Sequence, residues 1–262
     1  GREAEAEAEV EAEAGSGESR AGVRSGDRVL KVLEVGPGGP GRRFTPATHV
    51  VDHFSSQADF PGVQTYLLDL DRQRIPAAED EFDFVYARHF VEDANNPVGA
   101  FEEMARVSRR GYIETPSPMM EALYFQVSPS HTSTHFRGYV HHRFLVYANA
   151  SDNTLYVIPK FPTINHPGLD WGVQAEWVSL LTSYPHFYNT YYEWDKDDPA
   201  KQPRVVCLTH GEHFLIQHPS SYFGAIEQAC AASQEHTVGF FEQRINPFVR
   251  ERDEEQGRKL IR

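Results

Sequence analysis

The sequence predicts an α/β fold with a mostly parallel central sheet, and two observations carry this prediction. The first is an apolar run at residues 29–35 that contains one acid and leads into a glycine-rich turn at residues 36–39. The second is a series of short apolar runs that finish at, or within a few residues of, a carboxylate or a histidine. The carboxyl ends of parallel strands meet at one edge of an open sheet, so these polar groups are expected to face one crevice.

The elements of this sheet follow in order along the first half of the chain. Strands are expected at residues 29–35, 49–52, 63–68, 82–87 and 111–114. A helix is expected between the fourth and fifth strands, with Asn96 as its N-cap, Pro97 as its first residue and Val98, Phe101 and Met104 on one face. Only about a dozen residues, rich in proline and glycine, separate the first two strands, so a full crossover helix hardly fits there.

The second half of the chain is expected to add further elements to this core. A β-hairpin is expected from residues 144–148 and 154–159, because turn residues separate two apolar runs. Residues 161–203 are rich in aromatic side chains, and residues 204–208 form another apolar run that can join the sheet. Helices are expected near residues 119–127 and from Ser220 or Ser221 to Ala232, and the charged end, 250–262, is expected to fray or to form a surface helix.

Composition narrows the class of protein. The net charge of −13 argues against nucleic acid as a partner. The two cysteines, Cys207 and Cys230, form no CxxC pattern, which favours a reducing compartment. No apolar stretch approaches the ~20 residues that span a bilayer, and the first residues lack a signal-peptide layout, so a cytoplasmic protein with no membrane partner is expected.

The alternating Glu-Ala stretch near the start has repelling charges and no apolar face. Residues 1–27 are therefore expected to be a disordered acidic tail, with a short solvated helix as the alternative. Residues 28–262 are expected to form a single domain, with a cofactor-binding core at 28–118 and a substrate-side elaboration at 119–262.

The ordered succession of short motifs across residues 29–116 resembles the class I S-adenosylmethionine-dependent methyltransferases, with the small-molecule branch called type 11 as the nearest. The motifs are Val-Leu-Glu-Val-Gly-Pro-Gly, Val-Val-Asp, Leu-Asp-Leu, Glu-Phe-Asp-Phe-Val, His-Phe-Val-Glu-Asp, Asn-Pro and Phe-Glu-Glu-Met-Ala-Arg-Val. The resemblance implies a Rossmann-like class I methyltransferase sandwich with helices on both faces of the sheet. It also implies that S-adenosylmethionine is the cofactor.

The resemblance implies a role for individual positions. Glu34 and the glycine motif would hold the methionine part of the cofactor and its ribose. Asp52 would accept hydrogen bonds from the ribose hydroxyls, and a carboxylate has the two acceptor oxygens that a vicinal diol requires. Asp69 would lie beside the adenine, and Arg88 near the sulfonium and the substrate. The full set implied to bind the cofactor is Glu34, Val35, Gly36, Pro37, Gly38, Asp52, His53, Asp69, Leu70, Arg88 and His89.

The sequence defines the methyl acceptor and the catalytic base less closely than the cofactor site. If the acceptor is a hydroxyl, a base is needed, and the candidates are His89, His131, His135 and His142, because an imidazole with a pKa near ~6.5 suits proton removal at neutral pH. His131 and His135 lack the following Glu of a hydrolytic zinc motif, so no metal site is expected.

These observations predict methyl transfer to a small-molecule or glycan acceptor, as O- or N-methylation. The alternative is an inactive binding protein with the same fold. The shortened first crossover favours that alternative, as does Glu92-Asp93 where the family commonly has Glu-His. A nicotinamide-dependent oxidoreductase is disfavoured, because a pyrophosphate needs a helix N-terminus directly after the glycines.

Overall fold

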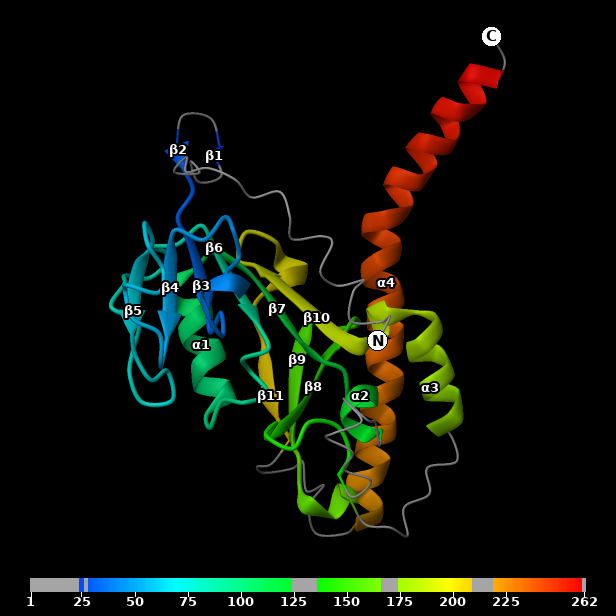
Figure 1. The fold of residues 1–262 in the computed structure, drawn as a ribbon. Coiled ribbons are helices and arrows are strands. Elements are labelled where there is room, and N and C mark those ends of the chain that lie inside the picture. Colours follow the sequence, from blue (N-terminus) through cyan, green and yellow to red (C-terminus); the bar gives the residue numbers. More distant parts are fainter. Residues whose placement is uncertain (1–23, 26–27, 124–135, 166–173, 209–218, 261–262) are drawn as a thin grey trace, which may run out of the picture.

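The computed structural model describes residues 24–25, 28–123, 136–165, 174–208 and 219–260, and Figure 1 shows their arrangement. A six-stranded sheet has the order β10-β7-β6-β3-β4-β5. Its strands are β3 (Val32–Val35), β4 (His49–Asp52), β5 (Gln64–Leu67), β6 (Phe84–Arg88), β7 (Arg110–Pro116) and β10 (Asn189–Asp195). Five strands are parallel and β10 is antiparallel to β7. The α/β class with a mostly parallel sheet is confirmed.

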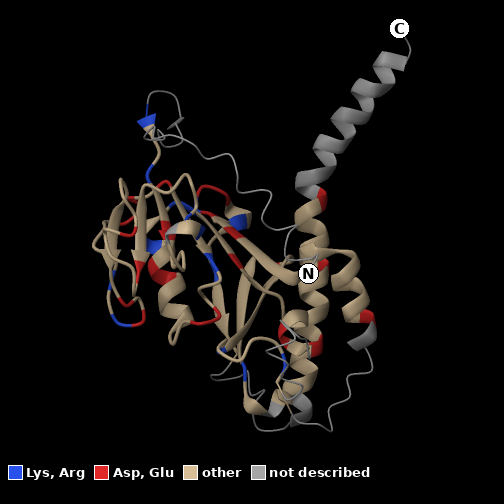
Figure 2. Cartoon of the chain, viewed as in Figure 1, with Lys and Arg blue, Asp and Glu red and all other residues tan. Residues whose placement is uncertain are grey.

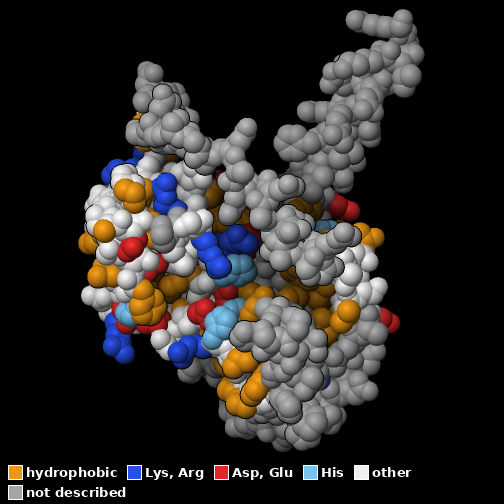
Figure 3. Space-filling model, viewed as in Figure 1, with side chains coloured by type: hydrophobic (Ala, Val, Ile, Leu, Met, Phe, Trp, Pro, Cys, Tyr) orange, Lys and Arg blue, Asp and Glu red, His pale blue; other side chains and the backbone are white. Residues whose placement is uncertain are grey.

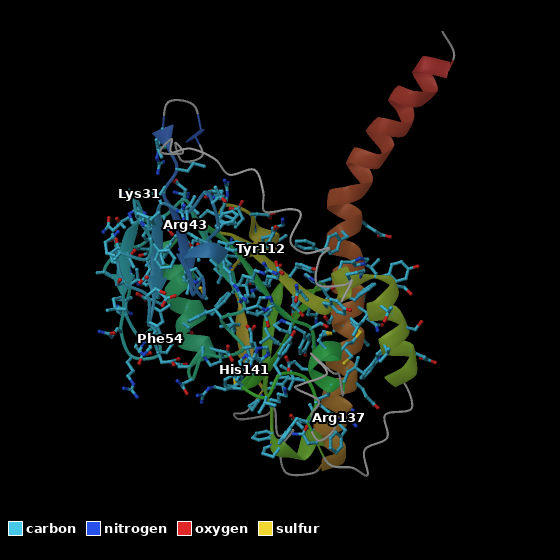
Figure 4. The ribbon with its side chains drawn as sticks, viewed as in Figure 1. Lys31, Arg43, Phe54, Tyr112, Arg137 and His141 are labelled. Atoms are coloured by element: carbon cyan, nitrogen blue, oxygen red, sulfur yellow. The ribbon has the colours of Figure 1, made fainter. Side chains whose placement is uncertain are left out.

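The strand order reverses between β3 and β6. From β3 the chain builds outward through β4 to β5, and it then returns to β6 on the other side of β3. An open α/β sheet binds its ligands at such a reversal, beyond the carboxyl ends of the strands. In Figure 4, Lys31 marks the opposite, amino-terminal edge of β3, and Phe54 lies beyond the carboxyl end of β4.

The crossovers of this sheet are unusually poor in helix. Helix α1 (Pro97–Val107) connects β6 to β7, and the Asn96 side chain accepts a hydrogen bond from the Gly99 amide as the predicted N-cap. The described crossovers at 36–48, 53–63 and 68–83 contain no α-helix, only the 3₁₀ turn η1 (Pro40–Arg42). The expected shortening of the first crossover is therefore present.

A second, three-stranded sheet packs against one face of the first. The predicted hairpin is confirmed as β8 (Phe144–Asn149) and β9 (Thr154–Pro159), and β11 (Val205–Cys207) pairs in parallel with β9. Alternate side chains of this sheet enter two different cores. Val146 and Val157 pack with the main sheet and α1, whereas Leu145 and Ile158 pack with the helices behind. This alternation follows from the two-residue period of a strand.

The outer layer consists of α2 (Pro118–Ala122), α3 (Gln174–Ser183) and the long α4 (Pro219–Leu260), whose last turns extend away from the body in Figure 1. Shorter turns are η2 (Pro162–Asn165), η3 (Pro185–Tyr188) and η4 (Pro199–Lys201). Among the described helices, none is long and apolar enough to cross a membrane.

Some expectations differ from the structure in detail. The first predicted strand is divided into β2 (Arg28–Val29), which pairs with β1 (Arg24–Ser25), and β3, because the Lys31 amide donates to the Asp83 carboxylate between them. The expected tail at 1–27 lies outside the described residues except for Arg24 and Ser25. Strand β10 lies within the stretch that the sequence marked only as aromatic-rich.

Candidate active site

The glycine turn after β3 lies at the reversal of strand order. The Gly36 amide donates to the Val51 carbonyl at 2.9 Å, which ties the turn to β4. Gly36 has φ +64°, and a Cβ at this position would lie 2.8 Å from Cδ2 of Phe90. A side chain here would face both backbone strain and a collision with the residue that follows His89.

Glu34 lies beneath this turn and is 2% exposed. Its Oε2 accepts a hydrogen bond from the Phe44 amide at 2.8 Å, so the carboxylate holds the shortened crossover against the sheet. Desolvation raises the pKa of Glu34 to about 7, although the Phe44 hydrogen bond and Arg43 oppose this shift.

Two carboxylates organise the next two strand ends. Asp52 is the last residue of β4, and its Oδ1 accepts hydrogen bonds from the amides of Phe54 and Ser55, each at 2.7 Å. Its Oδ2 has no partner among the described residues, so it can accept from a ligand. Asp69, after β5, accepts from the Asp71 amide at 3.0 Å. Both acids are therefore held in place by turns that follow their strands.

A cavity of about 370 Å³ lies between these strand ends. Seven of the residues expected to bind a cofactor line it: Gly36, Gly38, Asp52, His53, Asp69, Leu70 and His89. The structure adds residues that were not in the set expected to bind the cofactor, namely Val51, Phe54, Leu68, Asp71, Phe90, Asp93, Ala94 and Asn95. We call this space the glycine-loop cavity.

A second cavity of about 580 Å³ lies on the other side of the glycine turn. It is lined by Glu34, Gly36, Pro37, Gly38, Gly41, Arg42, Arg43, Tyr86, Arg88 and His89. Ten of the eleven expected residues thus line one or both of these cavities. The exception is Val35, whose side chain is fully buried in the core of the main sheet.

A third cavity, of about 440 Å³, opens toward the outer helices and is mainly apolar. Its lining residues are His89, Pro116, Met120, Leu123, Tyr139, Val178, Leu181, Thr182, Tyr188 and Asn189. We call it the outer cavity. Most of these residues come from the second half of the chain, and sequence reasoning did not single them out individually.

His89 lines all three cavities. It has φ +50°, an uncommon backbone conformation for a residue other than glycine, and its amide donates to the Glu114 carbonyl at 2.8 Å. Its Nδ1 lies 3.2 Å from Oε1 of the buried Glu92. Figure 3 shows histidine side chains grouped in the middle of this face, next to basic and acidic side chains.

The other candidate bases lie elsewhere. His142 is buried, and its Nδ1 lies 2.6 Å from Oε1 of Glu121, whose second oxygen accepts from Lys160. His131 and His135 lie outside the described residues. The Glu121–His142–Lys160 group was not anticipated, because its members are far apart in the sequence and Glu121 lies in a short apolar helix.

Comparison with known families agrees with this geometry. Residues 44–113 match a family model described as a methyltransferase domain, which spans the chain from the first crossover into β7. This stretch of the chain is therefore similar to the methyltransferase-domain family, and the mostly parallel sheet that it helps to form agrees with that similarity. The match covers about a quarter of the chain and includes Asp52, Asp69 and His89. No curated protein sequence matches the chain significantly.

Solved structures are similar over about a third of the chain or slightly more. A methyltransferase from Mesorhizobium loti is 20% identical, with 36% of this chain and 50% of that chain covered and a TM-score of 0.30. A possible histamine N-methyltransferase from Thermotoga maritima is 18% identical, with 34% and 46% covered and a TM-score of 0.30. An S-adenosylmethionine-dependent methyltransferase from Aquifex aeolicus is 16% identical, with 40% and 65% covered and a TM-score of 0.29. The chain thus spans about half the length of the first of these structures.

Proposed function

We propose that this protein transfers the methyl group of S-adenosylmethionine to a small-molecule acceptor. The observation that carries the proposal is that His89 borders the two cavities beside the glycine turn and the outer cavity. A methyl donor on one side and an acceptor on the other would meet at this residue. In-line transfer needs such positioning and the exclusion of water more than it needs covalent chemistry by the protein.

The cofactor is proposed to occupy the space around the glycine turn. Asp52 presents its Oδ2 for the ribose hydroxyls, while Oδ1 stays bound to two backbone amides. Asp69 and Leu70 would border the adenine in the glycine-loop cavity, and Glu34, Pro37 and Arg88 would border the methionine part on the other side. The bound cofactor supplies the electrophilic methyl group.

The outer cavity is proposed to hold the acceptor. Its volume of about 440 Å³ lies within the usual range for small-molecule sites, and its lining is mostly apolar, with polar groups from Thr182, Asn189 and Tyr188. The net charge of −13, and the intermixed acidic and basic residues that Figure 2 shows around the main sheet, favour an uncharged or cationic small molecule over a nucleic acid. A compact glycan would present similar chemistry.

His89 is proposed as the base when the acceptor is a hydroxyl. An imidazole held by the Glu92 carboxylate through Nδ1 keeps Nε2 as the proton acceptor. The cofactor site and the acceptor site are proposed to come from different parts of the chain. Residues 28–118 would hold the cofactor, and residues 119–262 would supply most of the acceptor site, in agreement with the lining of the outer cavity.

Calorimetric titration with S-adenosylmethionine and S-adenosylhomocysteine tests the cofactor site. Asp52→Asn keeps an oxygen for the Phe54 and Ser55 amides and loses the second acceptor, so we expect affinity to fall at least tenfold with little change in melting temperature. Asp197→Ala, which removes a partly exposed carboxylate on the β10–η4 turn, should bind like wild type. Equal affinity in wild type and Asp52→Asn would contradict the proposed site.

Transfer of labelled methyl to a panel of small hydroxyl and amine compounds tests the acceptor site. Val178 is 49% exposed and lines the outer cavity, so Val178→Trp should fill it and block transfer while cofactor affinity stays unchanged. Val238→Trp, at a 44% exposed position on α4 that does not line this cavity, is the matched control. Cofactor binding without turnover of any compound would favour the inactive binding protein, and binding of a nicotinamide dinucleotide instead would favour the oxidoreductase.

A further inference from the structure

A group of one aspartate and two histidine side chains lies next to the glycine-loop cavity. Asp93, His141 and His142 each present one potential ligand atom, and these three atoms lie within 4.8 Å of one another. Asp93 also lines the glycine-loop cavity. Figure 4 shows His141 in the lower middle of the view, a little below the level of Phe54, which lies beyond the carboxyl end of β4. We call these three residues the Asp-His-His cluster.

The buried histidine of the cluster is already oriented for metal binding. Oε1 of Glu121 lies 2.6 Å from Nδ1 of His142. A carboxylate only accepts hydrogen bonds, so Nδ1 carries the proton and Nε2 keeps its lone pair. Protein ligands to zinc are commonly oriented by a carboxylate in this way, which fixes the tautomer and raises the basicity of the imidazole.

Backbone contacts hold the two halves of the cluster together. The amides of Arg143 and Phe144 both donate to the Glu92 carbonyl, at 2.8 and 3.2 Å. The residues that follow His142 are thereby fixed to the residue that precedes Asp93. This pairing brings ligands from distant parts of the sequence to one place, independently of their side-chain contacts.

The charge around the cluster favours a cation. Three carboxylates, Glu92, Asp93 and Glu121, lie among these residues, and Glu92 and Glu121 are 1% exposed. In the described part of the chain, the Lys160 ammonium forms an ion pair with Glu121, and no lysine or arginine forms one with Glu92 or Asp93. Oε2 of Glu92 is buried and has no hydrogen-bond partner within the described residues. Buried negative charge of this kind is costly unless a cation compensates it.

We propose that Asp93, His141 and His142 bind a divalent transition metal of the zinc type. Two imidazole nitrogens and one carboxylate oxygen suit zinc, cobalt or iron(II) better than the oxygen-seeking magnesium or calcium. His141 is exposed and can rotate to bring its nitrogen to about 2.0–2.1 Å from the ion. Three protein ligands leave a coordination position for water or a ligand group. The site adds a metal to a cavity whose proposed cofactor needs none.

Metal binding to the full chain tests the proposal. The chelator-treated protein is titrated with Zn²⁺ by calorimetry and with Co²⁺ by visible absorption, where ligand-field bands report a defined coordination shell. We expect one tight site per chain. His141→Ala and Asp93→Asn should weaken it at least tenfold, and Glu121→Gln, a positioning variant, by about 10–100-fold.

Two controls separate the cluster from the other histidines of the chain. His186→Asn, outside the cluster, should bind metal like wild type. The double variant His131→Ala/His135→Ala should also keep the tight site. The proposal would be overturned if the wild-type protein showed no tight metal binding. It would also be overturned if His141→Ala and Asp93→Asn bound the metal as tightly as the wild type, or if the double variant lost the site. Circular dichroism identifies variants that fail to fold, and the exposed His141 keeps the test valid if the buried variants do fail. Since metal affinity is the readout, the result is independent of whether S-adenosylmethionine binds.

Discussion

Nδ1 of His89 lies 3.2 Å from Oε1 of Glu92, and both residues follow β6 at the point where the strand order reverses. The backbone of His89 has φ +50°, in the left-handed region, so the chain turns at this residue. The pair thus gives an imidazole that lines all three cavities and is oriented by a buried carboxylate.

His89→Asn tests this relationship. Asparagine tolerates φ +50° better than most residues, so the turn should persist while the base is lost. We expect methyl transfer to a hydroxyl acceptor to fall by about 10²–10⁴-fold, the usual range for a general base. Affinity for S-adenosylhomocysteine should change by only a few-fold. His186→Asn is the control, and an unchanged rate in His89→Asn would exclude His89 as the base.

Gly36→Ala and Gly38→Ala form a matched pair. Both glycines have positive φ, at +64° and +69°, but a Cβ meets Phe90 at 2.8 Å only in the first case and nothing within 4 Å in the second. We expect Gly38→Ala to cost about 1–2 kcal/mol through backbone strain, and Gly36→Ala to cost more through the added collision. Denaturant titration of both variants measures the difference. Equal losses would mean that Phe90 moves aside freely.

The raised pKa of Glu34 predicts that the stability of the folded protein depends on pH. Its pKa rises from an unfolded value of 4.5 to about 7 in the folded protein, so the folded state binds more protons between these values. The stabilisation of the folded protein by the protonated Glu34 is therefore fully present below about pH 4.5 and is lost as pH rises through about 7.

The neutral variant Glu34→Gln should be more stable than wild type at pH 8–9, on the order of 1–2 kcal/mol after allowance for solvent that reaches the carboxylate. This advantage should disappear near pH 4.5. Melting temperatures of both proteins across this pH range give the comparison. A constant difference at all pH values would assign the effect to packing and not to ionisation.

Gly111 tests the pairing of β7 with β10. A Cβ on this residue would lie 2.0 Å from Cη2 of Trp194, which is 1% exposed in the core. Gly111→Ala should therefore displace the indole and cost about 2–3 kcal/mol or more. Gly224→Ala, at an open position in helix α4, should leave stability unchanged or raise it by up to about 1 kcal/mol. Loss of stability in both variants, measured by thermal unfolding, would contradict this account.

Local signals explain which parts of the fold were predictable. β4 has the predicted bounds 49–52, the hairpin matches within one residue, and α1 begins at Pro97 behind its Asn96 cap. Each of these depends on residues that are neighbours in the chain, such as an N-cap, a turn or an apolar run. The glycine turn and the acids after the strands could be placed at one sheet edge for the same reason.

Other features had no local signal. The segment 189–195 reads as an aromatic-rich stretch, and it becomes a strand only because β7 offers an open edge. The division of β8 and β9 between two cores needs both layers to exist. Val35 was grouped with the glycine motif, yet its side chain lies in the core because strand alternation directs it away from the cavities.

The sequence by itself determined the α/β class, the mostly parallel sheet and the positions of the glycines and acids around the proposed cofactor site, because strand ends and turns are encoded within a few residues. Only the tertiary structure decided that His89 borders three cavities and that Asp93 meets His141 and His142. These meetings depend on contacts between segments that are far apart in the sequence, such as the Arg143 amide on the Glu92 carbonyl, and a local pattern carries no information about them.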